Sequence, residues 1–248
     1  MIPRILHYLW LSDEPRPELM RRCIASWQQV MPDFQIRHWS LADFDQSALP
    51  LFAQQAIALK QWAFASDVLR LWLLGQHGGV YFDADVLAVR SLEPLLGYEA
   101  FTAVEFNPLA FAAGNGAAWL DADGNRRAGV RHQGPPPGIG LQAAVLGAVA
   151  GHPFLRSCLA YYECRPFLEP DGSWHRDPIA PGIYGLAAEQ HGFRWINHMQ
   201  KLRHGVVVLP AEIIASTKAQ YGRNTLAFHC CAGSWRQSMP QVFPSGSS

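Results

Sequence analysis

The sequence predicts an α/β protein with a mainly parallel central sheet flanked by helices. Apolar runs of strand length alternate along the chain with amphipathic segments of helix length, which is the pattern of α/β proteins. Residues 80–82 form a short, fully apolar run directly after a glycine pair, as in strands buried on both faces of a parallel sheet. The chain has 248 residues, of which 49% are hydrophobic, so it can bury a sizeable core.

The first third of the chain predicts a strand, a helix, a second strand and a second helix. Residues 2–10 form an apolar run of strand length, and the amphipathic stretch 17–31 begins with a proline that suits the first turn of a helix. Residues 34–40 follow as the second strand. The apolar spacing of residues 54–76 predicts a helix that stops at Gly78-Gly79, because glycine commonly ends helices.

The rest of the chain continues this alternation less regularly. We expect two helices, over 138–150 and 154–162, and three strands, at 99–106, 206–209 and 226–229. No linker, charge run or internal repeat marks a domain boundary. The sequence therefore predicts a single domain over residues 1–240, followed by a disordered tail over residues 241–248.

The charge and cysteine composition excludes several classes of protein. Twenty lysine and arginine residues balance 20 acidic ones, so the chain lacks the basic excess that binding to nucleic acid requires. Its five cysteines form no CxxC pair, which favours a reducing cytoplasm over a zinc site or a disulfide scaffold. The sequence shows neither a signal peptide nor a run of about 18 apolar residues, so we expect no transmembrane segment.

Two aspartates follow the predicted strand at 80–82. Residues two apart along a strand project to the same side, so Asp83 and Asp85 can present carboxylates to one point at the strand's carboxyl end, where ligands of open α/β sheets bind. Hard oxygen ligands without a neighbouring cysteine suit Mg²⁺ or Mn²⁺, with a diphosphate and water completing the shell. The alternative is structural: two aspartates in a turn that cap backbone amides. The motif alone leaves both interpretations open.

The same tripeptide occurs a second time, at Asp121-Ala122-Asp123. It is followed by Gly124 and Asn125, which predicts a hairpin turn. It also lacks the glycine position and the closing glutamate of a calcium loop. We assign this second copy no chemistry.

A charged pair lies upstream of the first copy, inside the predicted helix at 54–76. Asp67 and Arg70 are three residues apart and share one face of that helix, where such a pair is ordinarily a modestly stabilising ion pair. The residues around them are strongly apolar, and charges on a buried helix need partners. The setting therefore weakens the interpretation as an ordinary surface ion pair.

These motifs occur together in a known family. Residues 65–86 (ASDVLRLWLLGQHGGVYFDADV) resemble the ASDxxRxxxLxxxGGxYxDxD signature of the DXD-containing sugar transferases, glycosyltransferase family 32. Residues 2–10 (IPRILHYLW) resemble the family's IPKIIHxIW, and residues 227–235 (AFHCCAGSW) resemble its AxHxxxGSW ending. The chain is more distantly similar to the clostridial glucosylating toxins. The central signature is specific, and the matching segments span most of the chain.

The resemblance implies a GT-A-like nucleotide-diphospho-sugar transferase fold. It also implies transfer of a sugar from a nucleotide-diphosphate donor to a hydroxyl of a glycan or lipid-linked acceptor. The metal, Mn²⁺ or Mg²⁺, is assigned by the resemblance to Asp83, Asp85 and His229, with Asp85 as the most direct ligand. Asp67 and Arg70 match positions that contact the donor sugar, so these two residues with Asp83 and Asp85 form the expected catalytic set.

The same resemblance implies the rest of the donor site. Trp10 matches an aromatic that stacks on the base, and Ser234 and Trp235 match a loop that closes over the metal and diphosphate. The other expected donor-binding residues are Leu9, Ser66, Tyr81 and Ala84. The segment 180–185 departs from the family, because it stands where a TGP-like sequence is usual, and part of the acceptor or donor wall is expected to differ there.

The family also implies a biological setting. We expect retention of configuration and a role in bacterial surface polysaccharide synthesis, in the cytoplasm or peripherally at the inner face of the membrane. The sequence specifies neither the donor sugar and base, nor the acceptor, nor the oligomeric state.

Three other functions fit parts of the pattern. A phosphatase or phosphotransferase could place D-A-D after an apolar strand, but Leu87 stands where that superfamily has Thr or Val. A glycoside hydrolase needs two carboxylates on either side of a sugar at a set separation, which a pair on one strand end does not provide. A catalytically silent nucleotide-sugar binding module is disfavoured because both aspartates and the HxxxGSW ending are present.

Overall fold

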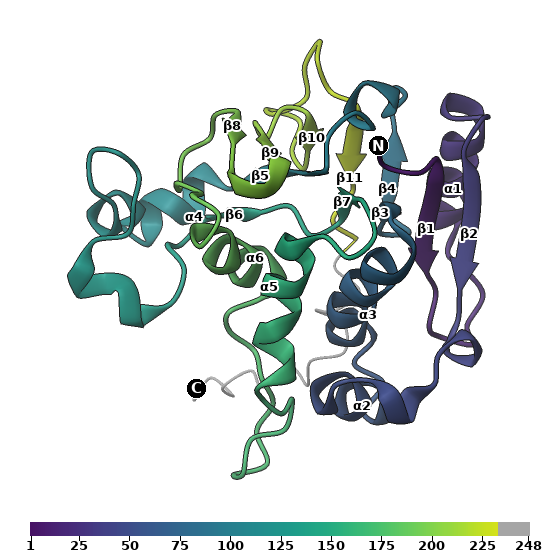
Figure 1. Cartoon of the computed structure of the whole chain (residues 1–248), viewed down its shortest axis with the longest axis horizontal. Coiled ribbons are helices and arrows are strands. Elements are labelled where there is room, and N and C mark those ends of the chain that lie inside the picture. The colour runs from purple at the N-terminus through teal and green to yellow at the C-terminus, as the bar shows by residue number, and fades with distance from the viewer. Residues whose placement is uncertain (233–248) are drawn as a thin grey trace, which may run out of the picture.

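The computed structural model of the chain describes residues 1–232 and shows helices on both faces of a central sheet (Figure 1). Its α-helices are α1 (Glu18–Val30), α2 (Leu51–Ala58), α3 (Trp62–His77), α4 (Pro108–Ala113), α5 (Pro153–Glu163) and α6 (Ala180–Glu189). Its strands are β1 (Ile5–Leu9), β2 (Gln35–Trp39), β3 (Gly79–Phe82), β4 (Val86–Ala88), β5 (Ala100–Phe106), β6 (Ile139–Leu141), β7 (Val145–Ala148), β8 (Gln200–Lys201), β9 (Val206–Leu209), β10 (Ile214–Ala215) and β11 (Ala227–His229). The expected domain limit at residue 240 and the expected tail, residues 241–248, lie outside the described residues.

The central sheet is mixed. Its strands follow the order β2-β1-β3-β7-β5-β9-β8, with β6 paired to β5. The pairs β1–β2, β1–β3 and β5–β9 are parallel, whereas β7 runs antiparallel to both of its neighbours and β8 runs antiparallel to β9. A smaller sheet has the order β10-β11-β4. The predicted α/β class is confirmed, with antiparallel strands inserted into a largely parallel sheet.

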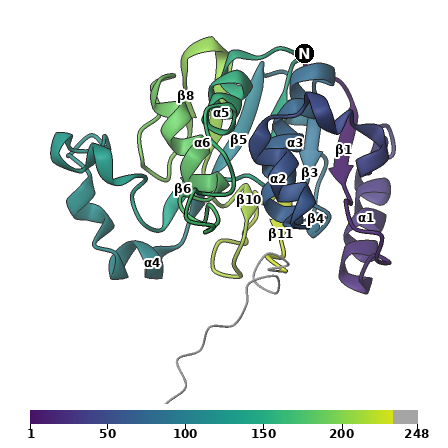
Figure 2. The ribbon, with the colours of Figure 1, turned by 90° about the horizontal axis from the view of Figure 1, so that it is seen from below.

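Two apolar cores hold the layers together. One joins the sheet to α2, α3, α5 and α6, with Phe52, Leu69 and Tyr184 among its fully buried members. The other lies between the sheet, α1 and β4, around Trp27 and Val86. Figure 2 shows α2, α3, α5 and α6 gathered together and α1 set apart beside β1. Strand β3 is buried along its whole length between these layers, as its apolar sequence predicts.

Most elements of the first half agree with the sequence prediction. The strands expected at 2–10 and 34–40 appear as β1 and β2, and the helix expected at 17–31 appears as α1. The helix expected over 54–76 is divided into α2 and α3 by a break at which Lys60 has a φ of 56°. The break lets the two helices pack against each other.

The helix predicted at 138–150 is wrong, because β6 and β7 occupy that segment. The run is buried on both faces, and periodicity cannot distinguish such strands from a buried helix. Gly147 also allows a close approach of the strands, since a Cβ there would lie 2.1 Å from the ring of Phe101 on β5. The sequence analysis also missed α4, α6 and the short strands β4, β8 and β10. Within residues 1–232, no helix has both the length and the apolar character needed to cross a bilayer.

Candidate active site

A glycine pair joins α3 to β3 and sets where the DXD segment begins. Helix α3 ends at Gly78, whose φ is 62°, and Gly79 follows with a φ of 103°, conformations that glycine adopts without strain. A Cβ on Gly79 would lie 2.7 Å from the carbonyl oxygen of Ile5 and 2.9 Å from Nε2 of His7 on β1. The glycines therefore let β3 enter the sheet directly beside β1.

Asp83-Ala84-Asp85 forms the connection between β3 and β4, at the carboxyl end of β3. The backbone N–H of Asp83 donates to the carbonyl of Ala144 at 2.9 Å, and that of Val86 donates to the carbonyl of Asp83 at 3.0 Å. Strand β3 ends at Phe82, as the sequence predicts, but the chain then turns, so the two-residue repeat of a strand does not apply to the aspartates. The turn nevertheless brings both carboxylates to one point.

His229 completes a group of three possible metal ligands. Strand β11 pairs antiparallel with β4, and this register sets His229 opposite Val86. Nε2 of His229 lies 3.5 Å from Oδ1 of Asp85. One ligand atom from each of Asp83, Asp85 and His229 lies within 4.8 Å of the other two. The structure thus brings together the three residues that the sequence analysis named as metal ligands.

Asp85 is held in place by the backbone that follows His229. The N–H of Ala232 donates to Oδ2 of Asp85 at 2.8 Å, and the N–H of Cys230 donates to the carbonyl of Asp85 at 3.0 Å. Burial disfavours the charged forms of both Asp85 and His229. Their mutual hydrogen bond and charge attraction, together with the backbone N–H of Ala232 at Asp85 and the Cys231 side chain at His229, outweigh this effect of burial. The pKa of Asp85 is therefore lowered, and the pKa of His229 is raised well above its usual value. Both shifts reflect how closely the side chains of Asp85 and His229 approach each other at the sheet edge.

A buried guanidinium links the two signature motifs. Arg70 is 3% exposed, and its Nη2 lies 3.1 Å from Oδ1 of Asp67 and 3.2 Å from Oδ1 of Asp83. Its remaining contacts go to the carbonyl and hydroxyl of Ser66 and to the carbonyl of Ala143, at 3.0, 2.9 and 2.8 Å. Arg70 forms the helical ion pair with Asp67 that their spacing in the sequence predicts. It also connects α3 to the DXD turn through Asp83.

The carboxyl group of Asp67 is strongly perturbed by this setting. Burial raises the pKa of Asp67 to about 7, against the lowering effect of Arg70 and with a further raising effect from Asp83. The hydroxyl of Tyr184 donates to the carbonyl of Asp67 at 3.0 Å and fixes the backbone there. Carboxyl groups with shifted pKa values concentrate at functional sites, so Asp67 belongs among the candidates for substrate contact.

Trp10 lies at the same edge of the sheet. It directly follows β1, is half-buried, and donates from Nε1 to the carbonyl of Glu14 at 2.8 Å. The parallel register of β1 and β3, in which His7 is level with Tyr81, sets Trp10 beside the DXD turn. The indole is therefore both fixed in position and partly exposed, as a ring that stacks on a ligand must be.

The other expected donor residues differ in what they can offer. The side chains of Leu9 and Ala84 are buried, so a donor contact from these two would use the backbone. Ser66 accepts from Arg70 and donates to the carbonyl of Ala63 at 2.7 Å. Ser234 and Trp235 lie outside the described residues.

The second D-A-D copy forms the turn that the sequence predicts. Oδ1 of Asp121 accepts from the backbone N–H groups of Asp123 and Asn125, both at 2.9 Å. Leu120 and Arg126 close the turn with an antiparallel bridge. Within residues 1–232, neither aspartate belongs to a group of possible metal ligands.

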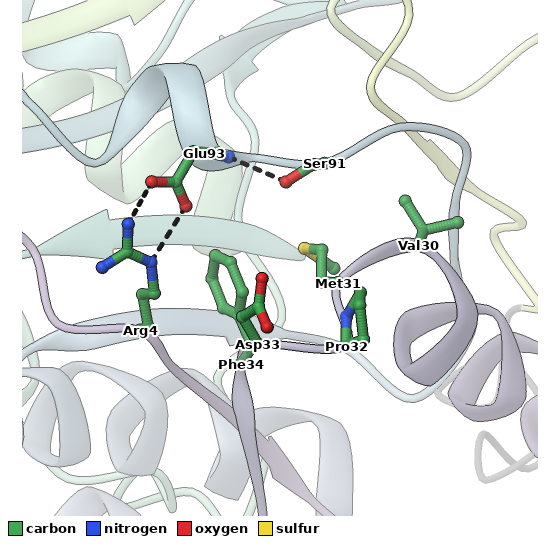
Figure 3. A pocket seen from close by; sticks show the side chains of 8 residues that line it. All are labelled: Arg4, Val30, Met31, Pro32, Asp33, Phe34, Ser91 and Glu93. Atoms are coloured by element: carbon green, nitrogen blue, oxygen red, sulfur yellow. Dashed lines mark hydrogen bonds and ion pairs between the residues drawn. The ribbon is translucent and has the colours of Figure 1, made fainter.

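A hollow of about 540 Å³ lies away from the site, at the amino ends of β1 and β2 (Figure 3). Its lining includes Phe34 and the ion pair between Arg4 and Glu93. It shares no residue with the predicted site, and we assign it no chemistry.

Motif reasoning missed one carboxylate of this region, Glu105 near the end of β5. Burial raises the pKa of Glu105, and Asp83, His229 and Arg70 lie near enough to affect it electrostatically. No motif surrounds Glu105. The available signal was a charged residue within the apolar strand AFTAVEF.

Comparison with known families points to the same region of the chain. A family model described as "Glycosyltransferase sugar-binding region containing DXD motif" matches residues 17–102. That range includes Asp67, Arg70, Asp83 and Asp85. The chain carries this glycosyltransferase DXD region.

Two fungal relatives match part of the chain. Inositol phosphoceramide mannosyltransferase 3 of Schizosaccharomyces pombe is 31% identical over 123 residues, which cover 46% of this chain and 34% of the relative. Mannosyl phosphorylinositol ceramide synthase SUR1 of Saccharomyces cerevisiae is 28% identical over 104 residues, which cover 41% of this chain and 27% of the relative. The chain therefore matches between about a quarter and a third of the length of these relatives.

A solved structure supports the fold around the DXD region. The PaToxG glycosyltransferase matches with a TM-score of 0.50 at 15% identity, over 76% of this chain and 69% of that chain. Likeness at this identity concerns the fold alone. The chain has the GT-A glycosyltransferase fold that the sequence resemblance implied.

Proposed function

We propose that this protein is a metal-dependent glycosyltransferase that moves a hexose from a nucleotide-diphosphate sugar to an acceptor hydroxyl. The observation that carries the proposal is the link made by Arg70, which joins Asp67 on α3 to Asp83 in the DXD turn. Asp83 in turn belongs to the three-ligand group with Asp85 and His229. The two halves of the glycosyltransferase signature therefore form one site at the edge of the sheet where ligands of α/β folds bind.

The ligand group fits a divalent cation. Two carboxylates and one imidazole suit Mn²⁺, and carboxylates with water and phosphate oxygens suit Mg²⁺. The side chains of Asp83, Asp85 and His229 are 25%, 12% and 18% exposed, so a ligand can reach each of them from solvent. When bound, the cation offsets the negative charge that develops on the diphosphate as its bond to the anomeric carbon breaks.

The residues beside the ligand group position the donor. Asp67 offers a carboxylate that can accept hydrogen bonds from sugar hydroxyls, and Arg70 fixes its orientation. The buried guanidinium also places a fixed positive charge close to the point where the diphosphate leaves, a preorganised stabilisation that needs no rearrangement during the reaction. Asp67 and Arg70 thus bind the donor and orient it.

The donor lies across the strand ends in this proposal. Trp10 at the end of β1 stacks on the base, the diphosphate lies over the DXD turn after β3, and the sugar extends toward β7 and β5. The strand order β1-β3-β7-β5 supports this direction. A donor that crosses the strand ends in this order passes from Trp10 over Asp83 to Glu105.

The acceptor we infer is a hydroxyl of a glycan or a lipid-linked glycan. The sequence resemblance supports a role in bacterial surface polysaccharide synthesis, in the cytoplasm at the inner face of the membrane, with retention of configuration. The fungal relatives are named for mannosyl transfer to inositol phosphoceramide, which supports a hexose donor and a lipid-linked acceptor.

Incubation with a panel of nucleotide sugars and Mn²⁺ tests the proposal, with release of nucleoside diphosphate as the measurement. Release from one donor, increased by an acceptor glycan and abolished by EDTA, is the expected result. Binding of a donor without any release would instead identify a silent binding module. Release of inorganic phosphate from phosphate esters would identify a phosphatase.

A further inference from the structure

Glu105 reaches the same edge of the sheet as the DXD turn. Strands β3 and β5 both pair with β7, and Ala148 of β7 is the partner of Gly79 on β3 and of Ala100 on β5. Counting forward from this shared level, Asp83 is four residues on and Glu105 is five. The two carboxylates therefore lie at nearly the same height, separated by two strand spacings, or about 10 Å.

The alternation of side chains decides the face on which Glu105 lies. Phe101 and Ala103 belong to the core shared with α1 and β4, whereas Val104 belongs to the core under α3 and α6. Alternate residues of a strand share a face, so Glu105 projects to the side of Ala103. Strand β4 and its partner β11, which carries His229, lie on that side.

Glu105 is a carboxylate that the protein itself leaves free. It is half-buried, and the six ion pairs formed within residues 1–232 do not include it. It is also absent from the group of possible metal ligands found among those residues. Burial raises the pKa of Glu105, Asp83 raises it further, and His229 and Arg70 lower it, which is consistent with a position among the site's charged groups.

A half-buried carboxylate without a protein partner keeps its hydrogen-bond acceptors available to a ligand. The metal group holds the diphosphate in the proposed function, and the sugar is attached directly to that diphosphate. Sugar hydroxyls are hydrogen-bond donors that a carboxylate can accept from in pairs. In the proposed function the sugar lies at the sheet edge, with Asp67 and Arg70 on the α3 face and Glu105 on the β4 face.

We propose that Glu105 accepts hydrogen bonds from hydroxyls of the donor sugar and so determines which sugar is transferred. The proposal rests on the glycosyltransferase function proposed above. It differs from a metal-binding role, because the contact is to the sugar and not to the cation or the diphosphate. The contribution of Glu105 therefore depends on the sugar being present.

The test compares binding of a sugar nucleotide with binding of the free nucleoside diphosphate. Wild type and the variants Glu105→Gln, Glu105→Asp and Glu105→Ala are titrated with UDP-glucose, UDP-galactose and GDP-mannose, and with UDP and GDP, in the presence of Mn²⁺. Glu99→Gln is the matched control, because Glu99 is an exposed glutamate next to the opposite end of β5. Melting temperatures verify folding, and Glu105→Gln preserves the shape of the side chain.

For the donor that wild type uses, we expect Glu105→Ala and Glu105→Gln to weaken binding at least tenfold. We expect binding of the free nucleoside diphosphate to change less than twofold, and Glu105→Asp and Glu99→Gln to stay closer to wild type. Equal losses for both ligands would overturn the inference in favour of a metal or diphosphate role. No loss in either would show that Glu105 does not contact the donor. Wild type that binds and turns over none of the sugar nucleotides would instead overturn the proposed function itself.

Discussion

The hydroxyl of Tyr81 donates a hydrogen bond to Oδ1 of Asp83 at 2.7 Å. Nη2 of Arg70 lies 3.2 Å from the same oxygen, and the guanidinium lies 5.0 Å from the centre of the Tyr81 ring. Both contacts use Oδ1, so Oδ2 is the oxygen that they leave to a ligand. A buried tyrosine and a buried arginine therefore set the orientation of the first DXD carboxylate.

Tyr81→Phe tests this orientation. The change keeps the buried ring and removes a hydrogen bond to a charged group, an interaction of about 1.5–3 kcal/mol. We expect transfer to fall roughly tenfold or more, and the Mn²⁺ concentration for half-maximal activity to rise, because Asp83 loses its fixed orientation. Metal titrations of the initial rate measure both effects.

Tyr162→Phe is the matched control for that experiment. Tyr162 is 1% exposed, and within residues 1–232 its hydroxyl has no hydrogen-bond partner. Removal of this hydroxyl should leave metal dependence and rate unchanged. Similar effects of both substitutions would show that Tyr81 acts through general packing.

Removal of the metal or of its central ligand should stop transfer. We expect EDTA to abolish activity and Mn²⁺ to restore it, because Asp83, Asp85 and His229 form a group of possible metal ligands. Asp85 is the central member, since it contacts both His229 and the backbone at Ala232. Asp85→Asn should reduce the rate by about 100-fold or more, since a metal supplies several kcal/mol of charge stabilisation in the transition state. The matched control is Asp123→Asn in the second D-A-D copy, which should leave the rate unchanged. Full activity in EDTA would contradict the metal assignment.

Trp10→Ala should weaken binding of nucleoside diphosphate roughly tenfold, because base stacking on an aromatic contributes about 1–3 kcal/mol. Trp10 is half-buried and outside the two apolar cores, so the melting temperature of the Trp10→Ala variant should stay close to that of wild type. Trp39 is the contrast: it is 4% exposed and packs in the larger core, so Trp39→Ala should lower the melting temperature strongly. A large thermal loss for Trp10→Ala with unchanged nucleotide affinity would identify Trp10 as a packing residue.

The sequence predicted the parts of the site that lie within short segments. The signature over residues 65–86 contains Asp67, Arg70, Asp83 and Asp85, and its glycines are explained by the close passage of β3 beside β1. The ending motif supplied His229. These residues could be predicted from the sequence because the motif is defined by their spacing along the chain.

Contacts between distant segments were not accessible in the same way. The bond between Arg70 and Asp83 depends on how α3 packs against the sheet, and the position of Glu105 depends on the pairing of β5 with β7. The segment at 138–150 was predicted as helix, so the strand that connects Asp83 to Glu105 was missing from the sequence prediction. Burial on both faces removed the alternation that would have revealed β7.

Because His7 is buried, we expect the protein to lose stability in acid. It is fully buried, its Nε2 contacts the carbonyl of Gly78 at 2.9 Å and its Nδ1 accepts from Trp39 at 3.0 Å. Burial lowers the pKa of His7 from 6.5 to about 4, so the unfolded chain binds a proton between these values and the folded protein does not. The contribution of neutral His7 to the free energy of unfolding is complete above pH 6.5. It is lost as the pH falls toward 4, which lowers the free energy of unfolding by up to about 3 kcal/mol. Denaturant unfolding at pH 7, 5.5 and 4 should show the stability gap between wild type and His7→Gln narrowing in acid, and a constant gap would refute this role.

The pair Asp67 and Arg70 should act on the donor sugar and not only as a helical ion pair. An exposed pair at this spacing contributes only about 0.2–0.5 kcal/mol, so its loss would barely alter catalysis. A buried pair that orients a sugar should matter far more, since a 1 Å misplacement can cost on the order of 100-fold in rate. Asp67→Asn removes the charge. Arg70→Lys removes the planar guanidinium, whose Nη2 reaches both Asp67 and Asp83 while Nε and Nη1 bind the carbonyls of Ser66 and Ala143. Arg126→Lys is the control, because Arg126 pairs with Glu189 in a different part of the fold and should affect stability alone. We expect both site variants to lose transfer while still binding free nucleoside diphosphate. Near wild-type transfer by both would reduce the pair to a structural brace between α3 and β3.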